Sequence, residues 1–114
     1  MTTSRINRFG FAEQADMEAG VARLDSSAIS ALSTALRELI DVVLERDEEF
    51  IDTLSEGAQS DFVVPLQLST RLFKTDDYTP MELVAAASTV RYCANGHLAE
   101  FPEGLVELLM ELPE

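Results

Sequence analysis

The longest regular pattern of apolar residues lies in residues 26–56. At 100° per residue its apolar side chains fall on one stripe, which is typical of an amphipathic helix. The stripe contains Ile29, Leu32, Leu36, Leu39, Ile40, Val43, Leu44, Phe50, Ile51 and Leu54. Asp25 or Ser26 can cap the start of this helix. Arg46 and Asp47 interrupt the spacing midway, so the pattern allows a bend or a break there.

Three shorter helices are predicted at about 65–74, 80–94 and 103–112. The first and second begin with a proline, which suits the first turn of a helix. The second has the strongest local signal in the chain, because Thr79 can act as N-cap and Glu82 stands at N3, where it can complete a capping box.

The helix predicted over 80–94 is apolar on nearly every side, so we expect it to be central in the fold. We expect Gly96 to end it in the left-handed conformation. No run of alternating polar and apolar residues is long enough to require a strand, although residues 6–11 or 61–64 could pair locally. The predicted class is all-α, a small bundle of four to five helices.

The first twelve residues differ from the rest of the chain. They are locally basic and aromatic around Gly10, which predicts an extended arm over 1–12, followed by a weak helix over about 11–24 and one helical domain over 13–114. The residues that give the arm this character are Arg5, Arg8, Phe9 and Phe11.

Charge and composition restrict the class of partner. The net charge is −13, and all of the excess lies in residues 25–114, so contact with nucleic acid phosphates or anionic lipid is disfavoured. No apolar stretch is long enough to span a membrane, the first ten residues lack the apolar core of a signal peptide, and a cytoplasmic location is expected. The single cysteine, Cys93, excludes an internal disulfide framework and a cysteine-rich zinc site.

One face of the long predicted helix is continuously acidic. It carries Glu38, Asp41, Glu45, Glu48, Glu49, Asp52 and Glu56. Four like-charge pairs at i,i+4 spacing would each destabilise the helix by about 0.2–0.5 kcal/mol. This acidic strip is interpreted either as a solvated face in a lysine-poor protein or as a surface that imitates a row of phosphates and docks on a basic groove.

Candidates for catalysis and metal binding are weak. Cys93 and His97 are four residues apart, but Cys93 faces the apolar side of its helix and is expected in the core, with His97 capping the helix end. The acidic residues lack the glycine turn of a calcium loop, and there is no glycine-rich phosphate loop. We therefore expect no enzymatic activity, no cofactor and no metal.

The resulting hypothesis is a non-enzymatic acidic protein that occupies a basic surface of a partner protein, as an inhibitor or nucleic-acid mimic. In composition it resembles the acidic inhibitors with which phages and toxin–immunity systems block nucleases, a resemblance of physical type without a family motif. The alternative is a structural or chaperone-like helical dimer that binds a partner segment in an apolar groove. A homodimer is expected because a monomer of this size has difficulty burying so many leucines, and the arm could anchor it. The groove would contain Leu83, Val90, Leu105, Leu108 and Leu112.

Overall fold

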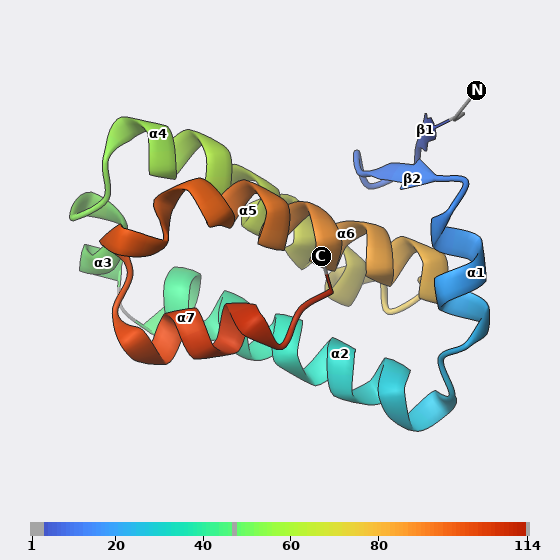
Figure 1. Ribbon diagram of the computed structural model, residues 1–114. Helices are drawn as coiled ribbons and strands as arrows, with labels where there is room; N and C mark the ends of the chain where they lie inside the picture. Colours follow the sequence, from blue (N-terminus) through green and yellow to red (C-terminus); the bar gives the residue numbers. More distant parts are fainter. Residues whose placement is uncertain (1–3, 47, 114) are drawn as a thin grey trace.

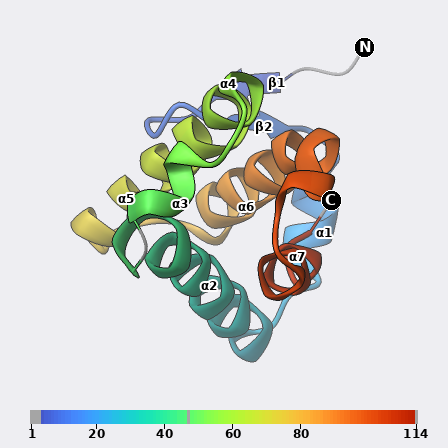
Figure 2. The same cartoon turned by 90° about the vertical axis from the view of Figure 1, so that its left-hand side faces the viewer.

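The central element of the fold is α6 (Pro80–Ala94), around which the other helices pack. The structure is a computed structural model that describes residues 4–46 and 48–113. Ten of the fifteen residues of α6 are buried, as expected for a helix that is apolar on nearly every side. It is surrounded by α1 (Met17–Ala22), α2 (Ser26–Ile40), α5 (Val64–Thr75) and α7 (Glu103–Met110), as Figures 1 and 2 show. The all-α class is confirmed.

The long predicted helix starts where its sequence pattern indicates but is not continuous. Asp25 caps α2 (Ser26–Ile40), accepting a hydrogen bond from the Ala28 N–H at 2.8 Å. The chain then continues as a π-helix, η1 (Asp41–Arg46), followed by the short α3 (Glu48–Asp52). The helix predicted over 26–56 is α-helical as far as Ile40, its hydrogen bonds change from i,i+4 to i,i+5 at Asp41, and its last described segment, α3, ends at Asp52. A bend or break was expected at Arg46 and Asp47, and Asp47 lies outside the described residues.

After α3 the chain turns back, and its next helices run antiparallel to α2 (Figure 1). Ser55 caps the short α4 (Glu56–Ala58), which passes through a second π-helix, η2 (Gln59–Val63), into α5 (Val64–Thr75). Helix α5 ends at Asp76, which adopts a left-handed conformation with φ of 53°. The predicted helix at about 65–74 is thus confirmed, with its proline in the first turn.

The capping box predicted for α6 is present. Thr79 Oγ1 accepts from the Glu82 N–H at 3.1 Å, and Glu82 Oε1 accepts from the Thr79 N–H at 2.9 Å. The other end of α6 differs from expectation, because Gly96 is not left-handed and the chain continues as a 3₁₀ helix, η3 (Asn95–Glu100). Helix α7 (Glu103–Met110) then runs beside α2.

The segment predicted as an extended arm is instead a β-hairpin that belongs to the core. Strands β1 (Ser4–Ile6) and β2 (Ala12–Gln14) pair antiparallel, and residues 1–3 lie outside the described part. Asn7 Oδ1 accepts from the Phe9 and Phe11 N–H groups in the connecting turn, and Gly10 has φ of +90°. Within residues 11–24, where a weak helix was predicted, the structure has a single short helix, α1 (Met17–Ala22).

The hairpin turn is fixed by two phenylalanines in the core and by an ion pair with α6. Phe9 and Phe11 are buried in the main core, so they anchor the hairpin to its own chain. Arg8 donates to both carboxylate oxygens of Glu82, with Nε–Oε2 at 2.8 Å and Nη2–Oε1 at 3.2 Å. Burial alone would raise the pKa of Glu82, but the bonds from Arg8 and Thr79 outweigh it and lower the pKa.

None of the helices in the described ranges combines the length and the apolar character that a membrane span requires.

We predict that Glu82→Ala destabilises the fold by about 1–3 kcal/mol, because it removes the charged bonds to Arg8 and half of the capping box. Urea unfolding at neutral pH measures this change. Glu107→Ala, at an exposed position on α7, is the control and should change the free energy of unfolding by less than about 0.5 kcal/mol. Equal effects of the two substitutions would contradict a tethering role for Glu82.

Candidate binding surface

The π-helix changes the predicted acidic strip. In a π-helix the residues five apart are hydrogen-bonded neighbours, so Arg46 lies one turn from Asp41 and donates to its carboxylate at 2.6 Å. Asp41 is therefore paired within the chain. The Arg46 guanidinium thus offsets the negative charge of Asp41 on this face.

The remaining strip residues are divided between elements. Glu56 lies in α4, separated from α3 by a turn, so it is not part of the same helix face. The side chain of Glu48 lies outside the described part of the structure. The strip residues that stay exposed, with no ion pair shown by the described residues, are Glu38, Glu45, Glu49 and Asp52.

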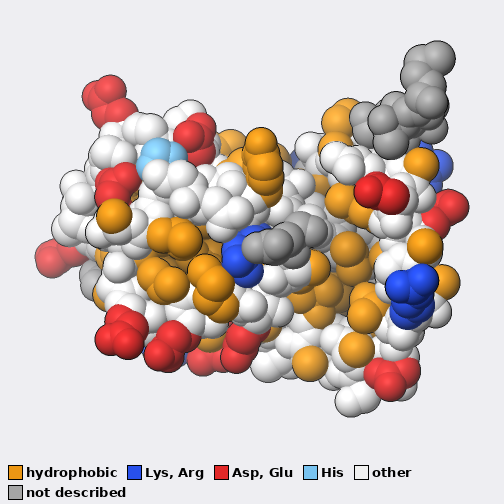
Figure 3. Space-filling view, viewed as in Figure 1, with side chains coloured by type: hydrophobic (Ala, Val, Ile, Leu, Met, Phe, Trp, Pro, Cys, Tyr) orange, Lys and Arg blue, Asp and Glu red, His pale blue; other side chains and the backbone are white. Residues whose placement is uncertain are grey.

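Helix α7 adds acidic residues that the sequence interpretation did not assign to the site. Glu103, Glu107 and Glu111 are exposed and spaced four residues apart. Acidic side chains follow the lower edge of the face in Figure 3, over α7 and α2. This spacing is visible in the sequence, but its proximity to the strip depends on α7 packing beside α2.

A slot with an apolar floor separates the two acidic helices. It has a volume of about 570 Å³, and Glu38 lines it from α2 while Glu107 and Glu111 line it from α7. We call this region the acidic slot. Its other lining residues are Val42, Arg46, Phe50, Pro102, Gly104, Leu105 and Leu108. Arg46 is the sole cation among them and already contacts Asp41.

The apolar groove predicted from the sequence is not an open groove. Leu83 and Val90 are fully buried, Leu105 and Leu112 are each 3% exposed, and only Leu108 is partly exposed. The reason is that α7 packs back on α6 and α2 within the monomer. The monomer thus buries these leucines, which removes the burial argument for a homodimer. The homodimer itself stays a prediction.

His97 is held between two carboxylates instead of capping the end of α6. Its Nε2 lies 3.0 Å from Asp61 Oδ2, and its Nδ1 lies 3.1 Å from Glu100 Oε2. Glu100 also accepts from the Ser55 N–H and hydroxyl, at 2.8 and 2.9 Å. A neutral imidazole can donate only one of the two bonds, so the hydrogen bonds to Asp61 and then Glu100 raise the pKa of His97.

The geometry offers no Cys–His pair. Both ring nitrogens of His97 bond carboxylates, and the Cys93 thiol, partly buried, has its pKa raised by burial. Asp61 and Glu100 bind opposite nitrogens of the His97 ring, so the two carboxylates and the ring do not point to one common position. In the described ranges, no three His, Cys, Asp or Glu side chains are placed to hold a metal ion.

Comparisons with protein-family models, with curated proteins and with solved structures found no match for this chain.

We predict a pH-dependent effect of His97→Gln on stability. A group with a raised pKa contributes stability below its unfolded pKa of about 6.5 and loses it as the pH rises through the folded value. The pKa of Glu100 is lowered by its bonds to Ser55, so this carboxylate is still ionised at mildly acidic pH. The substitution should therefore lower the free energy of unfolding more at about pH 6 than at about pH 9.

Urea unfolding at the two pH values measures the difference, with Ser60→Ala, at an exposed neighbouring position, as the control. A loss that is the same at both pH values would contradict an ionic role for His97.

Proposed function

We propose that the protein acts by binding and not by catalysis: it occupies a basic surface of a partner protein through the acidic slot. The observation that carries this proposal is the convergence of three carboxylates, Glu38, Glu107 and Glu111, on one apolar slot. None of the three has an ion-pair partner among the described residues. The slot is thus negative at its rim and apolar at its floor.

The distribution of charge along the chain supports the same surface. Residues 38–56 contain eight acidic residues and one arginine, for a net charge of −7. Residues 100–114 contain five acidic residues and no cation, for a net charge of −5. These two segments include the elements on either side of the slot, so negative charge is concentrated around it.

The chemistry of the slot favours arginine and lysine side chains. Their aliphatic stems can pack on Val42 and Leu108 while their charged ends meet the rim carboxylates. A surface built to bind phosphates presents many such side chains. We therefore propose that the partner is a nucleic-acid-binding protein and that the protein inhibits it by covering that surface.

The presence of a π-helix beside the slot is consistent with this role. Such helices are rare and are frequently found at functional sites. Here η1 contributes Val42 and Arg46 to the slot, and its spacing places Arg46 on Asp41. The rim carboxylates Glu38, Glu107 and Glu111 are left available for a partner.

The test begins with affinity capture from the host at about 50 mM and about 500 mM salt, because contacts between exposed charges weaken as salt screens them. The captured protein is then purified, and its affinity is measured by calorimetry. We predict that Glu38→Lys with Glu107→Lys weakens binding about tenfold or more, or about 1.4 kcal/mol. This double variant changes the net charge from −13 to −9.

The control is Glu18→Lys with Asp77→Lys, which makes the same change in net charge at exposed positions outside the slot. Its affinity should stay within about twofold. A second variant, Gly104→Leu, tests the slot without changing charge, because Gly104 lines the slot and a Cβ there meets no atom within 4 Å. Equal losses in both double variants, or an unchanged affinity for Gly104→Leu, would contradict binding in the slot.

A further inference from the structure

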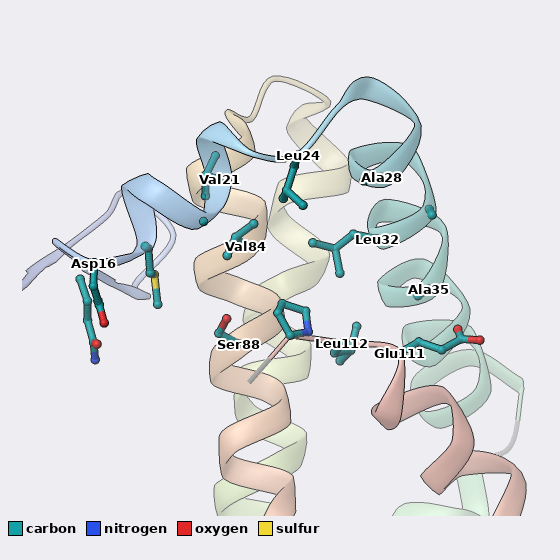
Figure 4. A pocket seen from close by; sticks show the side chains of 15 residues that line it. Asp16, Val21, Leu24, Ala28, Leu32, Ala35, Val84, Ser88, Glu111 and Leu112 are labelled. Carbon is teal, nitrogen blue, oxygen red and sulfur yellow. The ribbon is translucent and has the colours of Figure 1, made fainter.

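A second hollow lies along the N-terminal half of α2, whereas the acidic slot lies beyond it at the C-terminal end of that helix. It is a groove of about 820 Å³ between α1, α2 and α6, closed at one side by the residues that follow α7 (Figure 4). Small-molecule sites in proteins occupy about 300–1,000 Å³ and are often found between the helices of bundles. We call it the α1–α2–α6 groove.

The lining of this groove is largely apolar and contains no cation. Its aliphatic walls include Val21 and Leu24 from the α1 segment, Leu32 from α2 and Val84 from α6. Hydrophobic side chains are visible in the hollow to the right of centre in Figure 3. No Lys, Arg or His is among the described residues that line it. An apolar ligand therefore fits, and an anionic group on it has no counter-charge.

Two carboxylates flank the groove on opposite sides. Asp16 lies beside the start of α1, and Glu111 lies at the end of α7 (Figure 4). Asp16 occupies the N-cap position of α1 without making a side-chain cap bond, and both carboxylates lack ion-pair partners among the described residues. A cation at either side of the groove is favoured, and an anion is repelled.

A serine hydroxyl in the wall is open to the groove and makes no hydrogen bond with a described residue. Ser88 is 8% exposed and lines the groove, yet no described residue hydrogen-bonds its side chain. Other hydroxyls in the helices bond a carbonyl one turn earlier, as Ser69 does with Pro65 and Thr89 with Ala85. Every fully buried side-chain oxygen and nitrogen in the described ranges has a partner, so the unpartnered Ser88 oxygen is still reached from the groove, where a polar group on a ligand can hydrogen-bond it.

From these observations we infer that the α1–α2–α6 groove binds a small amphiphilic cation, an apolar chain or ring with an amine at one end. The apolar body lies between Leu32 and Val84, and the amine meets Asp16 or Glu111. Ser88 supplies a hydrogen bond to a polar group partway along the ligand. The groove shares only Glu111 with the acidic slot, and its other lining residues are its own.

The test uses three probes of equal chain length that differ only in the head group: octylamine, octanol and octanoate. Each is titrated into the full-length ¹⁵N-labelled protein, and amide shifts are followed by NMR. Octylamine should shift amides around Val84, Ser88 and Leu112 and bind about tenfold more tightly than octanoate at low salt, with octanol between them. Asp16→Asn with Glu111→Gln should remove the difference between octylamine and octanol and leave octanol binding unchanged.

A filling variant tests the position of the site. Gly20 lines the groove, and a Cβ at this position meets no atom within 4 Å, so Gly20→Leu adds a side chain that begins in open space at the groove wall. It should weaken octylamine binding about tenfold or more. Gly96→Leu is the matched control, because Gly96 is equally open but lies outside the groove. Circular dichroism and amide spectra establish that both variants fold.

Four results would overturn the inference. The first three are the absence of octylamine binding, equal binding of octylamine and octanoate, and amide shifts that map to the acidic slot. The fourth is a set of amide shifts in the groove that depend on protein concentration without any probe, which would assign the groove to a second copy of the chain. Retention of octylamine binding by Gly20→Leu would overturn the position of the site. A loss of partner binding in Gly104→Leu bears on the acidic slot alone, so the two proposals can fail separately.

Discussion

The constraint on which the fold depends is the burial of α6. A helix that is apolar on nearly every side can be stable only if other elements cover it, and its polar ends must still find partners. The N-terminal end is completed by the Thr79–Glu82 capping box and by Arg8 from the hairpin. Because Phe9 and Phe11 enter the core beside this contact, the position of the hairpin follows from the position of α6.

The other end of α6 positions α7 through a buried arginine. Arg91 is 8% exposed, and its Nη1 donates to the carbonyls of Leu109 and Leu112 at 3.1 and 3.3 Å. A cation that bonds the last carbonyls of a helix also complements the negative end of its dipole. The contact fixes the end of α7, where Glu111 lines both hollows and Leu112 lines the groove. Both candidate sites therefore depend on Arg91.

The parts of the fold that the sequence predicted are those determined by neighbouring residues. Asp25 and the Thr79–Glu82 pair define helix starts through contacts three residues apart, and both are present. Helix α6 was recognised as central because its composition excludes an exposed face. The π-helix was missed because a fixed 100° per residue assumes α-helical spacing throughout. The opposite charges of Asp41 and Arg46, five residues apart, are compatible with the wider turn and were the one local signal for it.

The hairpin and the candidate sites required information from distant residues. Asn7 and Gly10 could have indicated a turn between two short strands, but the burial of Phe9 depends on α6, seventy residues later. The acidic residues of α7 are readable at four-residue spacing, whereas their convergence with Glu38 exists only after α7 has packed beside α2. The same holds for Ser88, which looks like an ordinary helix serine until the groove around it is known.

The electrostatics of the acidic slot connect its stability with its proposed role. Glu38 on one side and Glu107 and Glu111 on the other carry like charge, so moving the two helices together over the apolar floor raises their mutual repulsion. The apolar floor formed by Val42 and Leu108 favours closure, because closure would remove it from water. These opposing forces keep an apolar surface accessible between charged rims. The cationic side chain proposed to bind here would reduce this repulsion and cover the floor at once, so the two forces that act on the empty slot both favour the proposed partner.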